Sequence, residues 1–403
     1  MTLNDTYYLN RSGRYANPLN SNDKLPAVYG DLTDSTSGNW ILPCIDTVNF
    51  VYCYSAQEAL SIAAGNGINI YKDGVLVNPA NYTFNENNNY ESEGSIATIT
   101  FTSDQENSVI SARGKGKPTT SGGATLMTDI VDIAYDFLTV RNTAWTSADF
   151  NIGKKAQASQ IFQTAGYKAA GVINEDIEIW TLLQQMMASF LGKVYLDGYG
   201  LICFDIDNGV VSESEYAAII PTSHIDFVSA VQKLENVINQ CPCSYAYNYA
   251  KGGEFKSHTD DMAHADISSQ GIYGIRKPTE PYRFYWCRDT TTVHAVQDII
   301  VNKYKDPDNA WEVTFDDNTS QAIHTDVNDL IIATIDRLYD KRGSQRTNPI
   351  WRTVTITPDL QTGKIRFIVQ DTGYYLYATY YADGSYPANG SIHAGSDRDL
   401  TVY

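Results

Sequence analysis

The stretch VSAVQKLENVINQCPCSYAYNY, residues 228–249, marks the point where the chain changes character. Its first half has the spacing of a helix. From Val237 it takes the period-two alternation of a strand and ends in tyrosines at every second position. Pro242 donates no backbone hydrogen bond, so this strand lies at a sheet edge or begins near the proline. A β-rich block and an α/β block precede the stretch, and a second β-rich block follows it. The sequence therefore predicts an α+β fold that is mainly β.

The composition is that of a folded protein of about two to four domains. The chain has 403 residues, of which 43% are hydrophobic and 19% charged. Tyrosine is abundant, with 29 Tyr against 13 Phe. Tyrosine is common in strands and in partly solvated interfaces, because its ring is apolar and its hydroxyl forms hydrogen bonds. The enrichment fits either a protein in lasting contact with other subunits or simply a β-rich fold.

The chain is acidic, with a net charge of −18 from 29 basic and 47 acidic residues. This balance argues against nucleic-acid binding, which needs cationic groups to neutralise phosphates. It is compatible with a channel that DNA crosses without being held, and equally with ordinary solubility.

The N-terminal residues contain no apolar segment of the kind that forms a secretory signal. No run of about 18 apolar residues predicts a membrane span. We therefore expect assembly in the cytoplasm, where cysteines stay reduced. The six cysteines are Cys44, Cys53, Cys203, Cys241, Cys243 and Cys287.

Five segments are predicted along the chain. They are a polar N-terminal arm at 1–24, a first β module at 25–121, an α/β insert at 122–222, a second β module with a helix at 223–373, and a C-terminal tail at 374–403 that is extended or ordered by partners. The two β modules are expected to be tube-like barrels, with the helices and hairpin of the insert between them.

Local signals define elements in the first module. Residues 68–77 predict a hairpin that turns at Asp73 and Gly74, a pair suited to the positive φ angles of a type I′ turn. Residues 95–103 and 108–116 predict a further strand pair, and 85–94 a loop. The Gly-Lys-Gly-Lys of residues 114–117 lacks the spacing of a phosphate-binding loop, so it predicts a linker instead.

Hydrophobic periodicity and turn residues also predict the elements of the insert and of the second module. Helices are predicted at 126–140, 154–167, 174–192 and 290–307; hairpins at 193–206 and 351–371; strands at 282–288, 311–315 and 325–335; and a polar loop at 251–271. Gly166 should end the second helix and Asn174 should cap the third.

Two groups of potential metal ligands stand out. One loop carries five such residues, but their spacing matches no metal motif, and a solvated loop explains them: His258, Asp260, Asp261, His264 and Asp266. Cys44 with Cys53, and Cys241 with Cys243, could hold zinc or an iron–sulfur cluster if the fold brought them together. Neither spacing is a C-x-x-C motif, and apolar packing on one strand face is the alternative. No cofactor is expected, and the cluster remains an open alternative.

No catalytic signature is present: the chain lacks G-x-S-x-G, H-E-x-x-H and a G-x-G-x-x-G after a strand. Carboxylate pairs such as Asp316 and Asp317 carry little information in so acidic a chain. The sequence therefore predicts a protein that is not an enzyme, and it assigns no catalytic, cofactor-binding or metal-binding residue. A cell-wall hydrolase is the least favoured alternative.

Several segments resemble the tail hub proteins of tailed bacteriophages and of gene-transfer agents. The resemblance extends from about residue 25 to residue 373 and lies in structural motifs rather than in catalytic or binding signatures. They are LPAVYGDLTDSTSGNWILPCIDTVNFVYC (25–53), TLMTDIVDIAYDFLTV (125–140), GYKAAGVINEDIEIWTLLQQMMASFLGKVYLDGYGLICF (166–204), VINQCPCSYAYNY (237–249), YWCRD (285–289), VNDLIIATIDRLY (327–339) and VQDTG (369–373).

The resemblance implies a virion tail protein that forms a homotrimer. Two barrel modules in each subunit would make a pseudo-sixfold ring that matches a sixfold tail tube on one side and a threefold tip on the other. The implied partners are tail-tube, distal-tail, tip or fibre and tape-measure proteins, with DNA passing through the ring without specific binding. The alternative is a distal-tail or fibre-attachment adaptor, hexameric, that binds carbohydrate or a partner.

Overall fold

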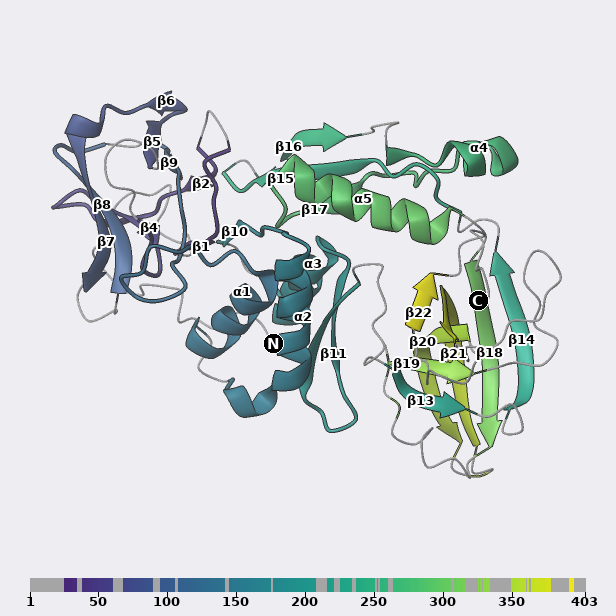
Figure 1. The fold of residues 1–403 in the computed structure, drawn as a ribbon. Helices are drawn as coiled ribbons and strands as arrows, with labels where there is room; N and C mark the ends of the chain where they lie inside the picture. Colours follow the sequence, from purple (N-terminus) through teal and green to yellow (C-terminus); the bar gives the residue numbers. More distant parts are fainter. Residues whose placement is uncertain are drawn as a thin grey trace. The chain divides into compact units, whose positions relative to one another are not determined.

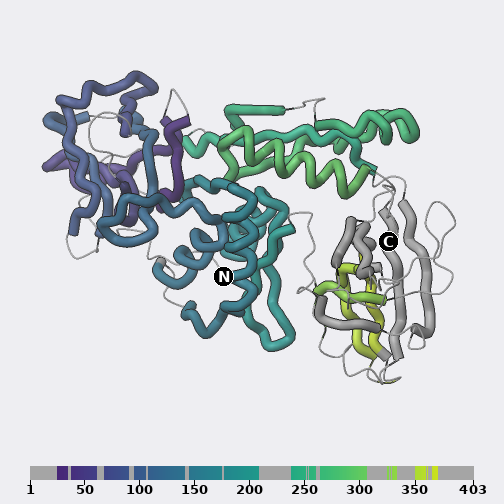
Figure 2. Tube along the Cα trace, in the orientation of Figure 1, coloured from purple at the N-terminus to yellow at the C-terminus, as the bar shows by residue number. Residues whose placement is uncertain are grey.

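The chain divides into two compact units that alternate along the sequence. Unit 1 comprises Met1–Asn208, Cys241–His264 and Pro278–Asp298, and unit 2 comprises Gly209–Gln240, Ala265–Lys277 and Ile299–Tyr403. Within them, the computed structural model describes residues 25–34, 38–60, 68–89, 95–105, 108–141, 145–174, 177–207, 216–220, 225–233, 237–250, 252, 254–259, 264–305, 308–316, 325, 327, 329–333, 349–359, 361, 364–377 and 391–394. Figure 2 traces the Cα path of unit 1 in sequence order, from purple to green. The predicted arm at 1–24 and most of the predicted tail lie outside the described residues, and the predicted segment boundaries stay predictions.

Two four-stranded sheets build the first β region of unit 1 (Figure 1). Their strands, in spatial order, are β2 (Trp40–Ile41), β9 (Ile110–Arg113), β5 (Asn69–Lys72) and β6 (Val75–Leu76) in one sheet, and β3 (Cys44–Asp46), β4 (Val51–Ser55), β8 (Ser95–Phe101) and β7 (Tyr82–Asn89) in the other. Residues of both sheets, including Trp40, Tyr54, Ile70 and Ile99, pack in one core. The sheets therefore enclose a shared hydrophobic interior.

The predicted hairpin at 68–77 is confirmed. β5 and β6 pair through Tyr71 with Leu76, and the turn residues Asp73 and Gly74 have φ angles of 50° and 83°. The predicted pairing of 95–103 with 108–116 is wrong, because β8 pairs with β4 and β7 while β9 pairs with β2 and β5. Alternation predicts that a strand exists, but it leaves open which of several similar neighbours pairs with it.

The helices of unit 1 follow the predicted order. They are α1 (Ile130–Asp136), which continues into a π-helical turn at Phe137–Arg141, then α2 (Ile152–Thr164) and α3 (Ile179–Ala188). Gly166 follows α2 with a φ of 70°, as predicted. Asn174 does not cap α3, because the helix begins later, after Glu178.

Two further strand pairs complete this part of unit 1. The predicted hairpin is formed by β11 (Gly192–Leu196) and β12 (Ile202–Ile206), and β1 (Ala27–Tyr29) pairs with β10 (Gly171–Ile173). The pairing of β1 with β10 joins the first residues of the β region to the helical insert.

A three-stranded sheet follows, in which β15 (Cys243–Asn248) lies between β16 (Glu254–Thr259) and β17 (Tyr282–Phe284). β15 is therefore a central strand, and it begins immediately after Pro242, as one of the two predicted alternatives requires. The predicted polar loop at 251–271 is wrong, since it contains β16 and the helix α4 (Ile267–Tyr273). Helix α5 (Thr290–Tyr304) lies where a helix was predicted.

Unit 2 contains one seven-stranded sheet. Its strands run β13 (Tyr216–Ile220), β19 (Leu330–Ala333), β20 (Pro349–Asp359), β21 (Lys364–Tyr377), β18 (Asp308–Asp316) and β14 (Ile225–Lys233), with β22 (Ser391–Ala394) also paired to β21. The predicted hairpin at 351–371 is confirmed by the pairing of β20 with β21. The helical phase predicted for the start of 228–249 is wrong: β14 pairs with β18 from Ile225 to Lys233, and this ladder outweighs local propensity.

The fold is thus α+β and mainly β, with several separate sheets. Among the described residues, no sheet closes into a barrel: each strand order has two ends. Two barrel modules are therefore not established by the described strands.

Candidate functional site

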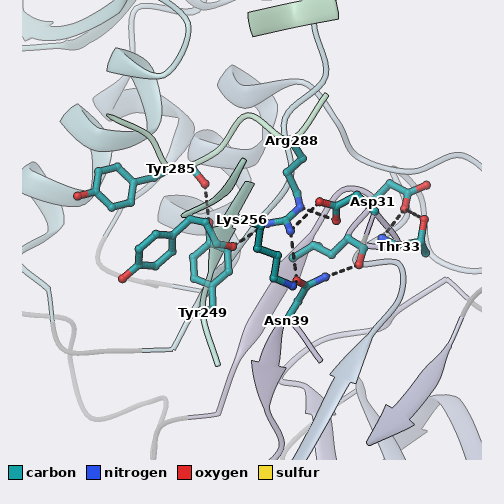
Figure 3. Close-up of polar contacts among 10 residues, drawn as sticks. Asp31, Thr33, Asn39, Tyr249, Lys256, Tyr285 and Arg288 are labelled. Carbon is teal, nitrogen blue, oxygen red and sulfur yellow. Dashed lines mark hydrogen bonds and ion pairs between the residues drawn. The ribbon is translucent and has the colours of Figure 1, made fainter. Parts of the chain in front are cut away.

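A buried guanidinium is the centre of a polar cluster in unit 1. Arg288 follows β17, and its side chain is 4% exposed. Its Nε and Nη2 atoms donate to the two carboxylate oxygens of Asp34 at 2.9 and 3.0 Å. Nη1 donates to the carbonyl of Tyr247 at 2.9 Å, and Nη2 also donates to Oδ1 of Asn39 at 3.2 Å. We call Arg288, Asp34, Asn39, Lys256 and the Tyr247 carbonyl the Arg288 clip (Figure 3).

The turn after β1 places the acidic partner. Gly30 has a φ of 71°, and a side chain there would meet the carbonyl of Ala169 at 2.2 Å, so the position requires glycine. Oδ1 of Asp31 then accepts hydrogen bonds from the backbone and hydroxyl of Thr33, which form an Asx turn. This compact turn brings the chain to Asp34.

Asn39 is fully buried and links all sides of the clip. Its backbone N–H donates to Ala112 at 2.6 Å, and its Nδ2 donates to the carbonyl of Leu32 at 2.6 Å. Its Oδ1 accepts from both Arg288 and the Lys256 ammonium group, which Figure 3 shows meeting at this amide. A buried amide has two acceptor lone pairs on oxygen, and here both have donors.

The clip therefore joins three segments of unit 1 that are far apart in sequence. Arg288 and Asp34 are 254 residues apart, and Lys256 and Asn39 are 217 apart. A bidentate arginine–carboxylate pair fixes geometry as well as adding attraction. These hydrogen bonds and the ion pair hold distant segments of unit 1 together.

Aromatic side chains pack beside the clip. The ring of Tyr247 lies 5.0 Å from that of Tyr249, 5.1 Å from Phe255 and 5.0 Å from Tyr285. The Tyr249 hydroxyl donates to the carbonyl of Tyr285 at 2.9 Å. Trp286, 2% exposed, lies next in sequence and accepts a backbone hydrogen bond from Ala170. Aromatic packing and the clip thus hold the same end of the β15–β17 sheet.

The cysteines predicted as possible ligands are all buried. Cys243 is the first residue of β15 and Cys241 precedes the strand, so the predicted single strand face is wrong, although the two sulfur atoms lie 3.8 Å apart. Burial raises the pKa of the Cys44 thiol to about 11, and it also raises the pKa of Cys287. Thiols of this kind are protonated and unreactive at neutral pH. Within the described chain, no three His, Cys, Asp or Glu side chains converge in the manner a metal ion needs.

The described histidines and aspartate of the predicted loop at 251–271 each contact a different partner. Nδ1 of His258 lies 2.8 Å from the hydroxyl of Ser244, and Nδ1 of His264 lies 2.7 Å from Oδ1 of Asp298. The carboxylate of Asp266 caps α4 by accepting from the N–H of Ser269, which lowers the pKa of Asp266. Asp260, Asp261 and Asp317 lie outside the described residues, as does the side chain of Asp316.

Sequence reasoning missed the Arg288 clip entirely. Its local signal is the charge of Arg288, one of two cations with Arg283 in the mainly aromatic run 282–288, where a buried charge needs a partner. Nothing in the sequence identifies Asp34 as that partner among 47 acidic residues.

No helix in the part of the chain described above combines the length and apolar character of a membrane-spanning segment. No family model matches the chain, and no curated protein matches it either. Among solved structures, the chain is similar to a tail protein from Neisseria meningitidis MC58. The two are 10% identical, with a TM-score of 0.33, and the match covers 86% of this chain and 97% of that one. A likeness at this level does not establish a common fold.

Proposed function

We propose that this chain is a structural protein of a bacteriophage tail. It would act as the hub of the tail tip, joining the sixfold tail tube to a threefold tip. The resemblance of residues 25–373 to tail hubs motivates the proposal. The observation that carries it is that extended β-structure lies in both compact units, as two sheets with one core in unit 1 and as a seven-stranded sheet in unit 2.

A duplicated β module gives a physical route from threefold to sixfold symmetry. Three copies with two modules each present six positions to a neighbouring sixfold ring. Closed rings of identical subunits are the ordinary outcome of head-to-tail contacts when the rotation closes. We propose that each unit supplies one tube-like module built on its sheets.

The charge and the chemistry of the chain support the same role. A net charge of −18 would repel phosphate from the wall of a channel, so DNA could pass without being held. The proposed hub is not an enzyme and needs no cofactor. The Arg288 clip would contribute by cross-linking distant segments of unit 1, so that the module keeps its shape under mechanical load.

Antibodies raised against the purified chain provide the test. Gold labelling of intact tails should mark the end of the tail that bears the tip, and quantitative mass spectrometry should find three copies per tail. Labelling along the tube or on the capsid, or absence of the chain from purified particles, would rule the proposal out. Six copies at the tip would instead favour the distal-tail adaptor.

A further inference from the structure

Two cysteines are in contact where the chain enters β15. Cys241 and Cys243 flank Pro242, and their sulfur atoms are 3.8 Å apart. Both residues are buried, with exposed fractions of 4% and 1%. The sulfur atoms of a disulfide bond are about 2.05 Å apart, so a modest approach of the two side chains is enough to form one.

The backbone on both sides of Pro242 is held in place. Nε2 of Gln297, a residue of α5 that is 1% exposed, donates to the carbonyl of Cys241 at 2.6 Å. Cys243 is paired with β16 on one side and with β17 on the other. The proline between them has a φ angle fixed near about −65° by its ring. The fold therefore keeps the two sulfur atoms close to each other.

The two sulfur atoms differ in how readily they react. The hydrogen bond that Cys243 shares with Cys241, followed by burial, raises the pKa of Cys243 above the ordinary 9.0. Cys243 therefore keeps its proton at neutral pH, and Cys241 is the sulfur that attacks an oxidant first, since the thiolate is the nucleophile. Because both residues are buried, the oxidant must be small and uncharged.

We propose that Cys241 and Cys243 form a disulfide bond when the folded chain meets a peroxide. Cys241 releases its proton to water, and the thiolate attacks one oxygen of hydrogen peroxide. The O–O bond breaks, Cys241 becomes a sulfenic acid, and the other oxygen leaves as hydroxide, which takes up the released proton. The Cys243 sulfur then attacks the Cys241 sulfur, and the sulfenic oxygen leaves as water with the Cys243 proton. The peroxide gains two electrons and two protons and becomes two water molecules.

The disulfide closes a small ring around Pro242. Such a ring is strained, and strained disulfides are easily reduced. The two residues should therefore remain thiols in a reducing cytoplasm and form the bond in oxidising surroundings. The closed ring fixes the start of the central strand of the three-stranded sheet, the strand that also supplies the Tyr247 carbonyl to the Arg288 clip. This reaction is independent of the proposed role in a tail.

Peptide mapping of the purified full chain tests the reaction. The chain is reduced, freed of reductant and treated with hydrogen peroxide at a pH of about 8.5, close to the ordinary pKa of a thiol, and is then unfolded and alkylated. Trypsin releases residues 234–251 as one peptide, in which Cys241 and Cys243 are the only cysteines. After peroxide this peptide should lose two hydrogen atoms and accept no alkyl group. Dithiothreitol should restore both alkylation sites.

Three variants assign the order of attack. Cys243→Ser should add oxygen to Cys241, because the sulfenic acid has no thiol to condense with. Cys241→Ser should leave Cys243 as an alkylatable thiol. Cys287→Ser is the matched control, since the Cys287 thiol lies in the same part of unit 1 and contacts the carbonyl of Asp289 at 3.7 Å. It should form the same disulfide as the wild type, and circular dichroism checks that each variant is folded.

Other results would overturn the proposal. A wild-type peptide 234–251 that still accepts two alkyl groups would show that the two thiols do not react, and one that gains oxygen atoms would show that they react separately. A bond from either residue to Cys287 would exclude the pairing, and oxygen added to Cys243 in Cys241→Ser would reverse the order of attack. The wild-type result needs no variant to fold. The hub proposal would survive each outcome, because tail labelling and copy number decide it separately.

Discussion

Replacing Asp34 with asparagine should destabilise unit 1 strongly, although the change only exchanges one carboxylate oxygen for an NH₂ group. The variant keeps the size of the side chain but removes the negative charge beside Arg288. The guanidinium, 4% exposed, would then lie buried with neutral partners only, and the new amide N–H₂ would face a guanidinium N–H. A donor would therefore oppose a donor at one of the two positions where Arg288 now donates to Asp34.

The magnitude follows from the burial of the pair. Removing one partner of a buried ion pair costs about 3–5 kcal/mol, because the other charge is left uncompensated. The Asp34 side chain is 28% exposed, so water can partly solvate the site, which places the expected loss near the lower limit. We expect about 3 kcal/mol for Asp34→Asn and a similar loss for Arg288→Met. The double variant should lose about 3–4 kcal/mol rather than about 6, a coupling of about 2–3 kcal/mol.

Hydrogen exchange followed by mass spectrometry suits a chain of two units, because it assigns opening to particular segments. Amides of β2, β15 and β17 should exchange about 100-fold faster in Asp34→Asn, since about 1.4 kcal/mol corresponds to a factor of ten. Urea unfolding of the same variant gives the free energy independently, with the midpoint shifted at constant slope.

An exposed ion pair in the same unit provides the control. Nη2 of Arg283 lies 3.0 Å from Oε2 of Glu280, with side chains 55% and 74% exposed. Glu280→Gln should cost less than about 0.5 kcal/mol, as is usual for solvated pairs. If Asp34→Asn costs no more than this control, or if the double variant equals the sum of the single ones, the clip is not the buried pair we describe.

The remaining predictions concern stability at single positions. Trp286→Ala should cost unit 1 about 3–5 kcal/mol in urea unfolding, because it empties a nearly fully buried indole site; a cost under 1 kcal/mol would mean the site collapses or is wet. Gly74→Ala should lower the free energy of unfolding by about 1 kcal/mol, because a φ of 83° disfavours any Cβ even though the surrounding space is open. Gly153→Ala in α2 should raise the free energy of unfolding by about 0.5 kcal/mol. Two changes of the same sign would contradict this reasoning. Burial raises the pKa of Asp129 above the ordinary 3.8, so its contribution to stability is fully present below pH 3.8 and is lost as the pH rises through the folded-state pKa. Asp129→Asn should remove this decline from a series of urea midpoints, and an unchanged pH profile would assign it to another group.

Elements defined by short-range signals were predictable. The type I′ turn at Asp73 and Gly74, the end of α2 at Gly166, and the long hairpin of β20 and β21 all depend on residues adjacent in sequence. A glycine that relieves a positive φ angle acts locally, so the sequence is enough to place it. The overall balance toward β-structure followed from the same local patterns.

Pairing and the site were decided by tertiary structure. β8 and β9 joined different sheets, and residues 225–233 became a strand because β18 offers them an antiparallel ladder. The Arg288 clip depends on a carboxylate 254 residues away. A strand needs hydrogen-bonding neighbours and a buried cation needs a carboxylate, but many residues of the sequence could fill either role. Which residue does so depends on the tertiary structure.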